Sequence, residues 1–438
     1  MTHEDRCGLP ISTSSDSAAS HYRTGVDLLL SAWPGAEEAL DDAIAADSRF
    51  AVAYAARARL HAFRGELVQA KHMAAGARTL VQRGSTDREK SHVNVVSLGI
   101  EGQSAQSLRG ALEHLERWPL DAVVMSLPLG AFGLFAFSGM EDPNQACAEL
   151  CDRHAKSYAT DDWWFITNRG WACVEVGQTE RGRELIERSL TLRAANANAA
   201  HGLVHALTEG GQWNETDTFI SRWLPSYDPN GLLFGHICWH QALVALDGDD
   251  PQRALQIYRE FLQPAIATGA PINVVTDSAS LLWRLQAYGH DVPRRLWDEA
   301  ASSAAGSFPR TGNSFVDIHM ALLSAATENS VEFDLRMNDL ILLLEAENLR
   351  AGPVVPAICR GLQAFATGDA RRCAEILEPF AGEFARIGGS HAQRELIDDA
   401  LILSLIRSGA TEKARSRLDQ RLHRRQSGRD SLWRSALC

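Results

Sequence analysis

The sequence predicts an all-α protein that folds as a solenoid of about ten antiparallel helix hairpins. Apolar residues recur with a helical period almost everywhere, and these stretches end at Gly, Asp, Asn or Pro. Alternating strand patterns are nearly absent. The tetrapeptides EVGQ, beginning at Glu175, and EGGQ, beginning at Glu209, lie 34 residues apart, which is the tetratricopeptide period of one helix–turn–helix per repeat.

The elements follow in order along the chain. The first clear repeat unit is residues 35–80, in which small residues such as Ala39 and Ala55 allow packed helices to approach closely. Related but drifted units begin at Asp247 and Thr367, and the last begins at Ser408. Roughly twenty helices are therefore expected.

The predicted domain organisation is simple, because no linker of disordered composition divides the chain after its first residues. Residues 1–18 are polar and Ser-rich and are predicted to form a disordered tail. Residues 19–425 are predicted to form a single continuous superhelix, followed by a C-terminal tail at 426–438. Arginines concentrated near the end predict a solvated final helix face, with a binding patch as the alternative; they are Arg415, Arg417, Arg421, Arg424, Arg425 and Arg429.

Composition and charge narrow the classes of partner. The net charge is −12, and an acidic chain is a poor partner for nucleic acid or an anionic membrane. No apolar stretch is long enough for a membrane span, and the N-terminus lacks the features of a signal peptide. A cytoplasmic location with reduced cysteines is therefore expected. The absence of phosphate-binding loops, dinucleotide fingerprints and nucleophile elbows predicts that there is no nucleotide cofactor.

Two His-x-x-x-His pairs are the strongest candidates for chemistry. His201 and His205 share one helix face, and His236 and His240 repeat that spacing about one repeat later. Four imidazoles could hold a transition metal or act as general acid and base without one. Glu209 follows His205 by four residues and could orient or neutralise an imidazole. Hydrogen bonding between packed repeats, or coincidence, are the alternatives, and the lack of HExxH disfavours a metalloprotease.

Further polar residues lie in otherwise apolar helices. Asp277, Ser280 and Arg284 share one helix side, where Asp277 could orient an imidazole or could simply cap a helix. Arg284 or Arg394 could clamp a substrate carboxylate. The other candidates for substrate binding are Trp239, Ser280, His319 and Gln393.

Seven ordered segments resemble the tetratricopeptide repeat protein 38 family. They are FGLFAFSG (132–139), DWWF (162–165), HGLVHALTEGG (201–211), HICWHQALVAL (236–246), TDSASLLWRL (276–285), FVDIH (315–319) and GGSHAQRE (388–395). The resemblance covers roughly residues 22–425, with mild departures at Gly202, Thr208 and Glu395. It implies a helical-repeat fold in the cytosol and supplies no reaction.

Two functions are therefore expected from the sequence. The first is an enzyme or binding protein with a His/Glu/Asp-lined pocket in its middle third, which takes a small polar molecule or peptide. The second is a non-catalytic interaction scaffold, because repeat superhelices offer extended concave surfaces. A homodimer is compatible with either function. Clustering of the polar residues in the middle third, rather than once per repeat, favours the first.

Overall fold

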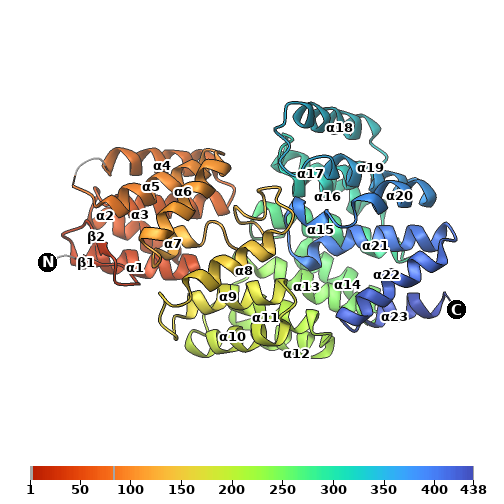
Figure 1. Ribbon diagram of the computed structural model, residues 1–438, viewed down its shortest axis with the longest axis horizontal. Coiled ribbons are helices and arrows are strands. Elements are labelled where there is room, and N and C mark those ends of the chain that lie inside the picture. The colour runs from red at the N-terminus through yellow and green to blue at the C-terminus, as the bar shows by residue number, and fades with distance from the viewer. Residues whose placement is uncertain (1–2, 82–83, 438) are drawn as a thin grey trace.

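Helices form nearly all of the regular structure in the computed structural model, which describes residues 3–81 and 84–437 (Figure 1). Within these residues, ten pairs of consecutive helices pack as hairpins. The pairs are α1 (Asp16–Leu30) and α2 (Ala36–Ala46), α3 (Ala51–Phe63) and α4 (Leu67–Leu80), α5 (Asp87–Ile100) and α6 (Ser104–Arg117), α9 (Trp163–Glu175) and α10 (Thr179–Leu192), α11 (Ala197–Glu209) and α12 (Trp213–Trp223), α13 (Phe234–Asp247) and α14 (Pro251–Ile257), α15 (Pro271–Ala287) and α16 (Arg294–Ser307), α17 (Ser314–Ala326) and α18 (Ser330–Glu345), α19 (Val354–Ala366) and α20 (Ala370–Leu377), and α21 (His391–Arg407) and α22 (Thr411–Arg424).

Shorter elements complete the chain between and after these hairpins. A small antiparallel ladder pairs β1 (His3–Glu4) with β2 (Pro10–Ile11), with His3 opposite Ile11. The remaining helices are α7 (Ala122–Met125), α8 (Pro143–His154), α23 (Gly428–Ser435), the 3₁₀ turns η1 (Leu224–Ser226), η3 (Glu378–Phe380) and η4 (Phe384–Ile387), and the π-helical turn η2 (Tyr258–Leu262). None of the helices in the described ranges is both long and apolar enough to cross a bilayer.

The predicted tetratricopeptide-like α-solenoid is confirmed. Helices α9 and α11 begin and end 34 residues apart, so the EVGQ and EGGQ tetrapeptides mark equivalent helix ends. Each helix starts at an Asp or Asn N-cap whose side chain accepts a backbone N–H, from Asp162 for α9 and Asn196 for α11. A close approach between Gly170 of α9 and Gly182 of α10 brings that hairpin together, because a Cβ on either residue would clash with the opposite helix.

The odd-numbered helices from α9 to α21 form the inner layer, because each packs on the next odd-numbered helix. Helix α21 also returns to α15, where Arg284 donates a hydrogen bond to the Ala392 carbonyl at 2.8 Å. Helices α11, α13 and α15 are therefore buried on nearly every side. Polar side chains on them must be satisfied inside the protein or used.

Two large apolar clusters flank the middle of the chain. One is built from helices α1–α9, and the other from residues of α13 onward. The segment between α7 and α8 links the two sides, since Ala131 accepts a hydrogen bond from the Gly389 amide at 3.0 Å. The inner helices that carry the predicted polar residues lie between these clusters.

The first 18 residues differ from the predicted disordered tail. Residues 1–2 lie outside the described ranges, but Arg6 pairs with Asp27 at 2.8 Å and with Asp162 at 3.1 Å. Ser15 caps α1, which already begins at Asp16. Polarity alone misled the prediction, because these polar groups have partners far away along the chain.

The C-terminal tail predicted at 426–438 also differs. Helix α23 occupies residues 428–435, and Ser427 and the Gly428 amide bind the Asp247 carboxylate at the end of α13. Residue 438 lies outside the described ranges. The predicted solvated arginine face is likewise incomplete, since Arg425 is buried and the side chains of Arg421 and Arg429 are nearly so.

Candidate functional site

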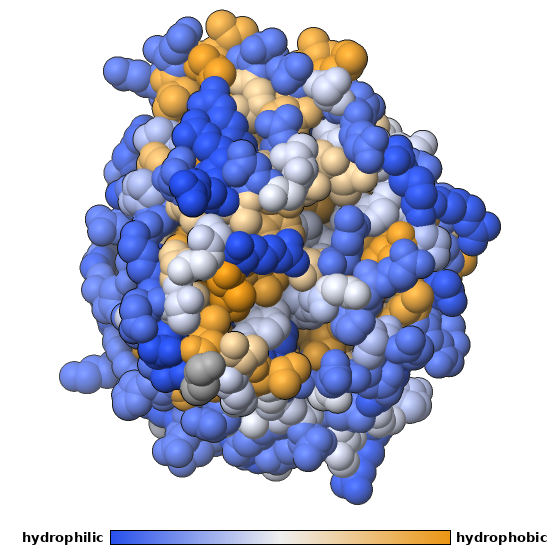
Figure 2. All heavy atoms as spheres, turned by 90° about the vertical axis from the view of Figure 1, so that its right-hand side faces the viewer, coloured by the Kyte–Doolittle hydropathy of each residue, from blue (hydrophilic) through white to orange (hydrophobic). Residues whose placement is uncertain are grey.

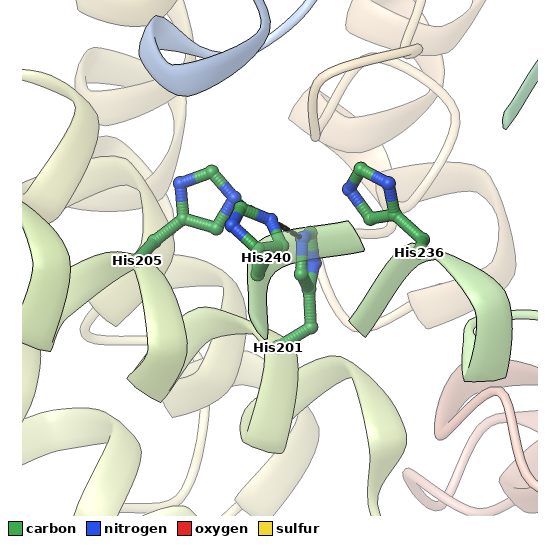
Figure 3. Close-up of side chains that lie close together, drawn as sticks. All are labelled: His201, His205, His236 and His240. Carbon is green, nitrogen blue, oxygen red and sulfur yellow. Dashed lines mark hydrogen bonds between the residues drawn. The ribbon is translucent and has the colours of Figure 1, made fainter. Parts of the chain in front are cut away.

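Four histidines from two neighbouring inner helices converge at one point (Figure 3). His201 and His205 lie on α11, and His236 and His240 lie on α13. The Nε2 atom of His201 is 3.1 Å from Nε2 of His205 and 3.2 Å from Nε2 of His240. One ring nitrogen from each of the four residues lies within 4.8 Å of all the others.

This spacing fits the edge of a tetrahedral metal site. Zinc–nitrogen bonds of about 2.0–2.1 Å place tetrahedral ligand nitrogens about 3.3 Å apart. Two neutral imidazole nitrogens that face each other at 3.1 or 3.2 Å can share only one proton, so at least one lone pair needs another partner. The donor set is therefore chemically suited to a transition-metal ion.

Burial keeps the central imidazoles neutral. Desolvation, followed by the neighbouring imidazoles, lowers the pKa of His201 and His240 well below the ordinary value for histidine. Neutral imidazole is the form that ligates metal ions or acts as a base. The lowered pKa values therefore make both residues available for either chemistry at neutral pH.

Two carboxylates lie directly behind the cluster. Asp277 of α15 binds Nδ1 of His236 at 2.8 Å, which leaves the other ring nitrogen facing the cluster. Glu175 of α9 lies 3.4 Å from Nδ1 of His205. A carboxylate behind a ligating histidine fixes its ring and raises its basicity. Two such carboxylates also balance the charge of a divalent ion.

The two carboxylates sit in different electrostatic surroundings. Burial raises the pKa of Asp277, although His236 and Arg284 oppose that shift. Burial alone would also raise the pKa of Glu175, but His205 and His391 lower it to about 2. Glu175 is therefore the more firmly ionised of the two carboxylates.

A cleft of about 400 Å³ reaches the histidine cluster from the side of α3 and α5. His201 and His236 line its inner end, together with Gln393 of α21. Gln393 donates its backbone N–H to Ser390 and accepts from the Ser390 amide, but its buried Nε2 has no partner. The cleft thus ends on two imidazoles and a free amide donor, which is suited to a polar group of a ligand.

Most of the predicted site residues lie at or directly behind this cluster. Trp239 stacks on the His236 ring and donates its Nε1–H to the Ser280 hydroxyl at 3.0 Å. Arg284 lies beneath Trp239 and is bound by the Ser280 and Ala392 carbonyls. The fold therefore gives Ser280 and Arg284 packing contacts behind the histidines.

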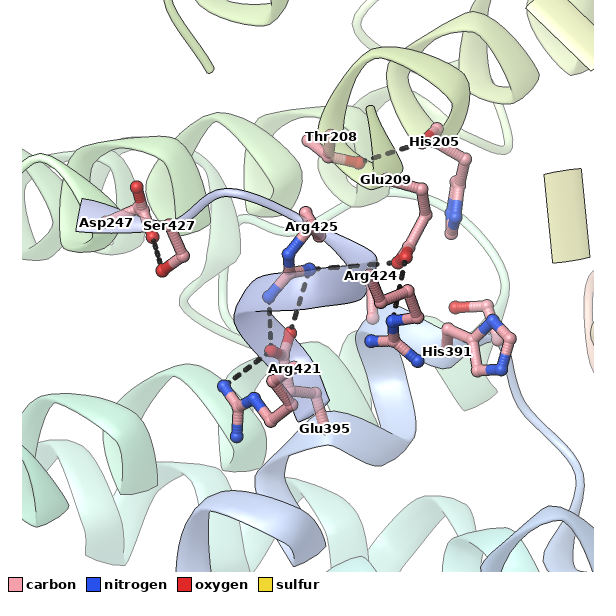
Figure 4. Close-up of polar contacts among 12 residues, drawn as sticks. His205, Thr208, Glu209, Asp247, His391, Glu395, Arg421, Arg424, Arg425 and Ser427 are labelled. Carbon is pink, nitrogen blue, oxygen red and sulfur yellow. Dashed lines mark hydrogen bonds and ion pairs between the residues drawn. The ribbon is translucent and has the colours of Figure 1, made fainter. Parts of the chain in front are cut away.

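Glu209, His319 and Arg394 lie elsewhere. Glu209 ends α11 and faces the C-terminal arginines, 3.8 Å from Nε of Arg424 and 3.7 Å from Nη1 of Arg425 (Figure 4). His319 donates Nδ1–H to the Phe315 carbonyl at 2.7 Å. Arg394 donates to the carbonyls of the Gly388–Gly389 turn.

Sequence reasoning missed Glu175, Trp171 and Arg59. Glu175 occupies in α9 the position that Glu209 occupies in α11, so the 34-residue repeat carried a signal for it. Trp171 packs its ring 4.5 Å from that of His205. Arg59 lines the cleft from α3, and no local pattern marks it, because its neighbours there come from remote segments.

Comparisons with known proteins give limited information. No model of a known protein family matches the chain. Yeast Tom70 is similar at 12% identity over 96% of this chain and 94% of that chain, with a TM-score of 0.33. The P58(IPK) TPR domain gives 13% identity, coverage of 92% and 89%, and a TM-score of 0.22. The IFIT1 monomeric mutant with Gppp-AAAA gives 13%, 94% and 88%, and 0.33.

At TM-scores this low, these likenesses carry no argument about ligands or activity. The assignment of the fold rests on the helix hairpins themselves. The chain is thus a tetratricopeptide-like helical-repeat protein with a histidine cluster on its inner helices.

Proposed function

We propose that this protein binds a transition-metal ion through His201, His205, His236 and His240 and presents it to a small polar molecule in the adjoining cleft. The convergence of four imidazole nitrogens within 4.8 Å of one another carries the proposal. A bound ion would supply Lewis-acid chemistry at the inner end of the cleft. Without an ion, the same neutral imidazoles would act as general acid and base.

The surroundings of the cluster support a resident ion. Its helices are rigidly packed, and Asp277 and Glu175 orient two of the rings from behind. His201 is the only one of the four that is not fully buried, and it borders the cleft with His236. The site is therefore closed on its inner side and accessible from the cleft, as a catalytic metal site requires.

Elemental analysis of protein purified without a metal-affinity step tests the proposal. We expect a near-stoichiometric transition metal in the native chain and its loss from the His205→Ala/His240→Ala double variant. His154→Ala is the matched control, because His154 is also buried in a helix but lies outside the cluster. Its metal content should equal that of the native chain.

A well-folded native protein without metal would exclude the metal-binding function. Metal addition should also raise the melting temperature of the native chain and leave that of the double variant unchanged. If the double replacement only lowered the melting temperature, the histidines would merely connect neighbouring repeats, as a scaffold function predicts.

A protein-interaction scaffold is the second candidate, and an exposed apolar stripe on α18 favours it. Val331, Leu335 and Leu342 share one helix face and are 68%, 58% and 62% exposed. Apolar side chains reach the surface at the upper edge of Figure 2, the level at which Figure 1 places α18. Such a stripe suits a partner helix, a peptide or a second copy of the chain.

The stripe makes a separate prediction. The triple variant Val331→Ser/Leu335→Ser/Leu342→Ser should lose partners that cross-link to α18 in cell extract, because apolar burial at that face is removed. The His205→Ala/His240→Ala variant is the control and should retain them. Cross-linking mass spectrometry measures both, and retention of the same partners by the triple variant would exclude this surface.

We further propose that the chain belongs to the tetratricopeptide repeat protein 38 family and resides in the cytoplasm. The ordered motifs support the family, since their polar residues include His201, His236 and Asp277 of one cluster. The described cysteines support the location. All seven are free thiols, and six of them are buried.

A further inference from the structure

Arg59 is a cation in the wall of the cleft that lacks an acidic partner. It extends from α3, one Nη atom donates to the Ser126 carbonyl at 3.2 Å, and the guanidinium lies 4.7 Å from the centre of the Phe63 ring. Its Nε–H is buried without a hydrogen-bond partner. Within residues 3–81 and 84–437, no carboxylate forms an ion pair with it.

Neighbouring arginines show how unusual this is. Arg57, two residues earlier on α3, pairs with Glu37 and Asp41, and Arg88 of α5 pairs with Asp121 at 2.7 Å. A cation in a site of low polarity is costly unless it is paired. Desolvation lowers the pKa of Arg59 to about 10, so the side chain remains charged at neutral pH. The fold therefore holds an uncompensated positive charge in the cleft.

The walls of the cleft between Arg59 and the histidines are mainly apolar. They come from the segment between α7 and α8 and from the helices on either side. The apolar side chains that line it are Leu29, Leu127, Leu129, Phe132, Leu134 and Trp164. A ligand that fills the cleft would therefore bury an apolar body between a cation at one position and polar donors at another.

We propose that the cleft binds a small organic carboxylate with a mainly apolar body, whose anionic group pairs with Arg59. The planar guanidinium matches a carboxylate in shape and hydrogen bonding, and one cation balances one negative charge. The polar end of the ligand lies at Gln393, His201 and His236. This identifies the substrate class of the proposed function and shares its cleft, although pairing with Arg59 does not require the metal ion.

Isothermal titration calorimetry of the full chain with octanoate and 4-phenylbutanoate, each against its neutral amide, tests the inference. We expect each carboxylate to bind at least about tenfold more tightly than its amide. Arg59→Met should abolish that preference because it keeps the apolar stem without the charge. Arg59→Lys should retain part of it, because the charge remains without the planar fork.

Arg117→Met is the matched control. Arg117 lies 4.3 Å over the Trp118 ring, but it is exposed and lies outside the cleft. Its carboxylate preference should equal that of the native chain. Equal affinity for carboxylate and amide, no binding of either carboxylate, or an unchanged preference in Arg59→Met would each overturn the inference, provided that thermal melting shows a folded variant.

Repeating the titration on the His205→Ala/His240→Ala variant separates the two proposals. A carboxylate preference that persists there supports Arg59 as the anion site, whatever the outcome for the metal. A preference that disappears with the histidines, and survives Arg59→Met in the native chain, would assign the anion to the metal site and overturn this inference.

Discussion

Buried imidazoles in this protein have two different roles, and their contacts distinguish them. His201 and His240 face other imidazoles, so their nitrogens are only satisfied by sharing a proton or an ion. His319 of α17 is equally buried, but its Nδ1–H donates to the Phe315 carbonyl within its own helix. The second arrangement is complete without a ligand, so His319 belongs to the packed core.

His319 predicts a loss of stability in acid. Burial lowers its pKa to about 4, whereas the unfolded chain binds that proton near pH 6.5. The unfolded state therefore carries more protons between these values, and stability falls as the pH decreases from 6.5 to 4. The loss is on the order of 3 kcal/mol at pH 4.

The variant His319→Asn tests this, because the asparagine amide can donate in place of Nδ1–H and does not titrate. Urea unfolding at several pH values, followed by circular dichroism, should give curves for the two proteins that converge in acid. The native chain should lose more stability than the variant below pH 6.5 and show a constant difference above it. Parallel curves throughout would contradict the prediction.

At the scale of the helix, the sequence predicted positions along each element well. The spacing of four between His201 and His205, and between His236 and His240, places each pair on one helix face, as the structure confirms. The 34-residue offset also located equivalent helix ends. Both results depend only on local helical geometry, which apolar periodicity reveals.

Contacts between elements were predicted less well, because they depend on which helices meet. Glu209 was assigned to the histidines from its spacing, yet it ends α11 and faces Arg424 and Arg425. Glu175 reaches His205 from the preceding inner helix. Arg59 reaches the cleft because the segment between α7 and α8 folds across it, which no local pattern encodes.

At the scale of the whole molecule, the C-terminal hairpin closes the superhelix onto its middle. Glu395 of α21 binds Arg421 of α22 at 2.8 Å and also pairs with Arg425 and Arg429. Arg425 faces Glu209 of α11 (Figure 4). The buried carboxylate thus holds together arginines that would otherwise repel one another, and it connects the end of the chain to a helix that carries two of the four histidines.

Replacing Glu395 by Gln should therefore destabilise more than the end of the chain. Removing one partner of a buried charge network leaves uncompensated charges, and the expected loss is about 3–5 kcal/mol in the free energy of unfolding. Glu412→Gln is the matched control, because Glu412 is exposed and pairs with Arg415 alone, so its expected loss is about 0–1 kcal/mol.

Hydrogen exchange distinguishes closure of the whole superhelix from a local anchor. If the C-terminal hairpin closes the molecule, Glu395→Gln should increase exchange of the amides in α11 as well as those in α22 and α23, since Arg425 would no longer be held against Glu209. Faster exchange confined to residues 411–437 would show that the network only anchors the end of the chain. The histidine cluster lies on α11, so only the first outcome makes its geometry depend on the C-terminus.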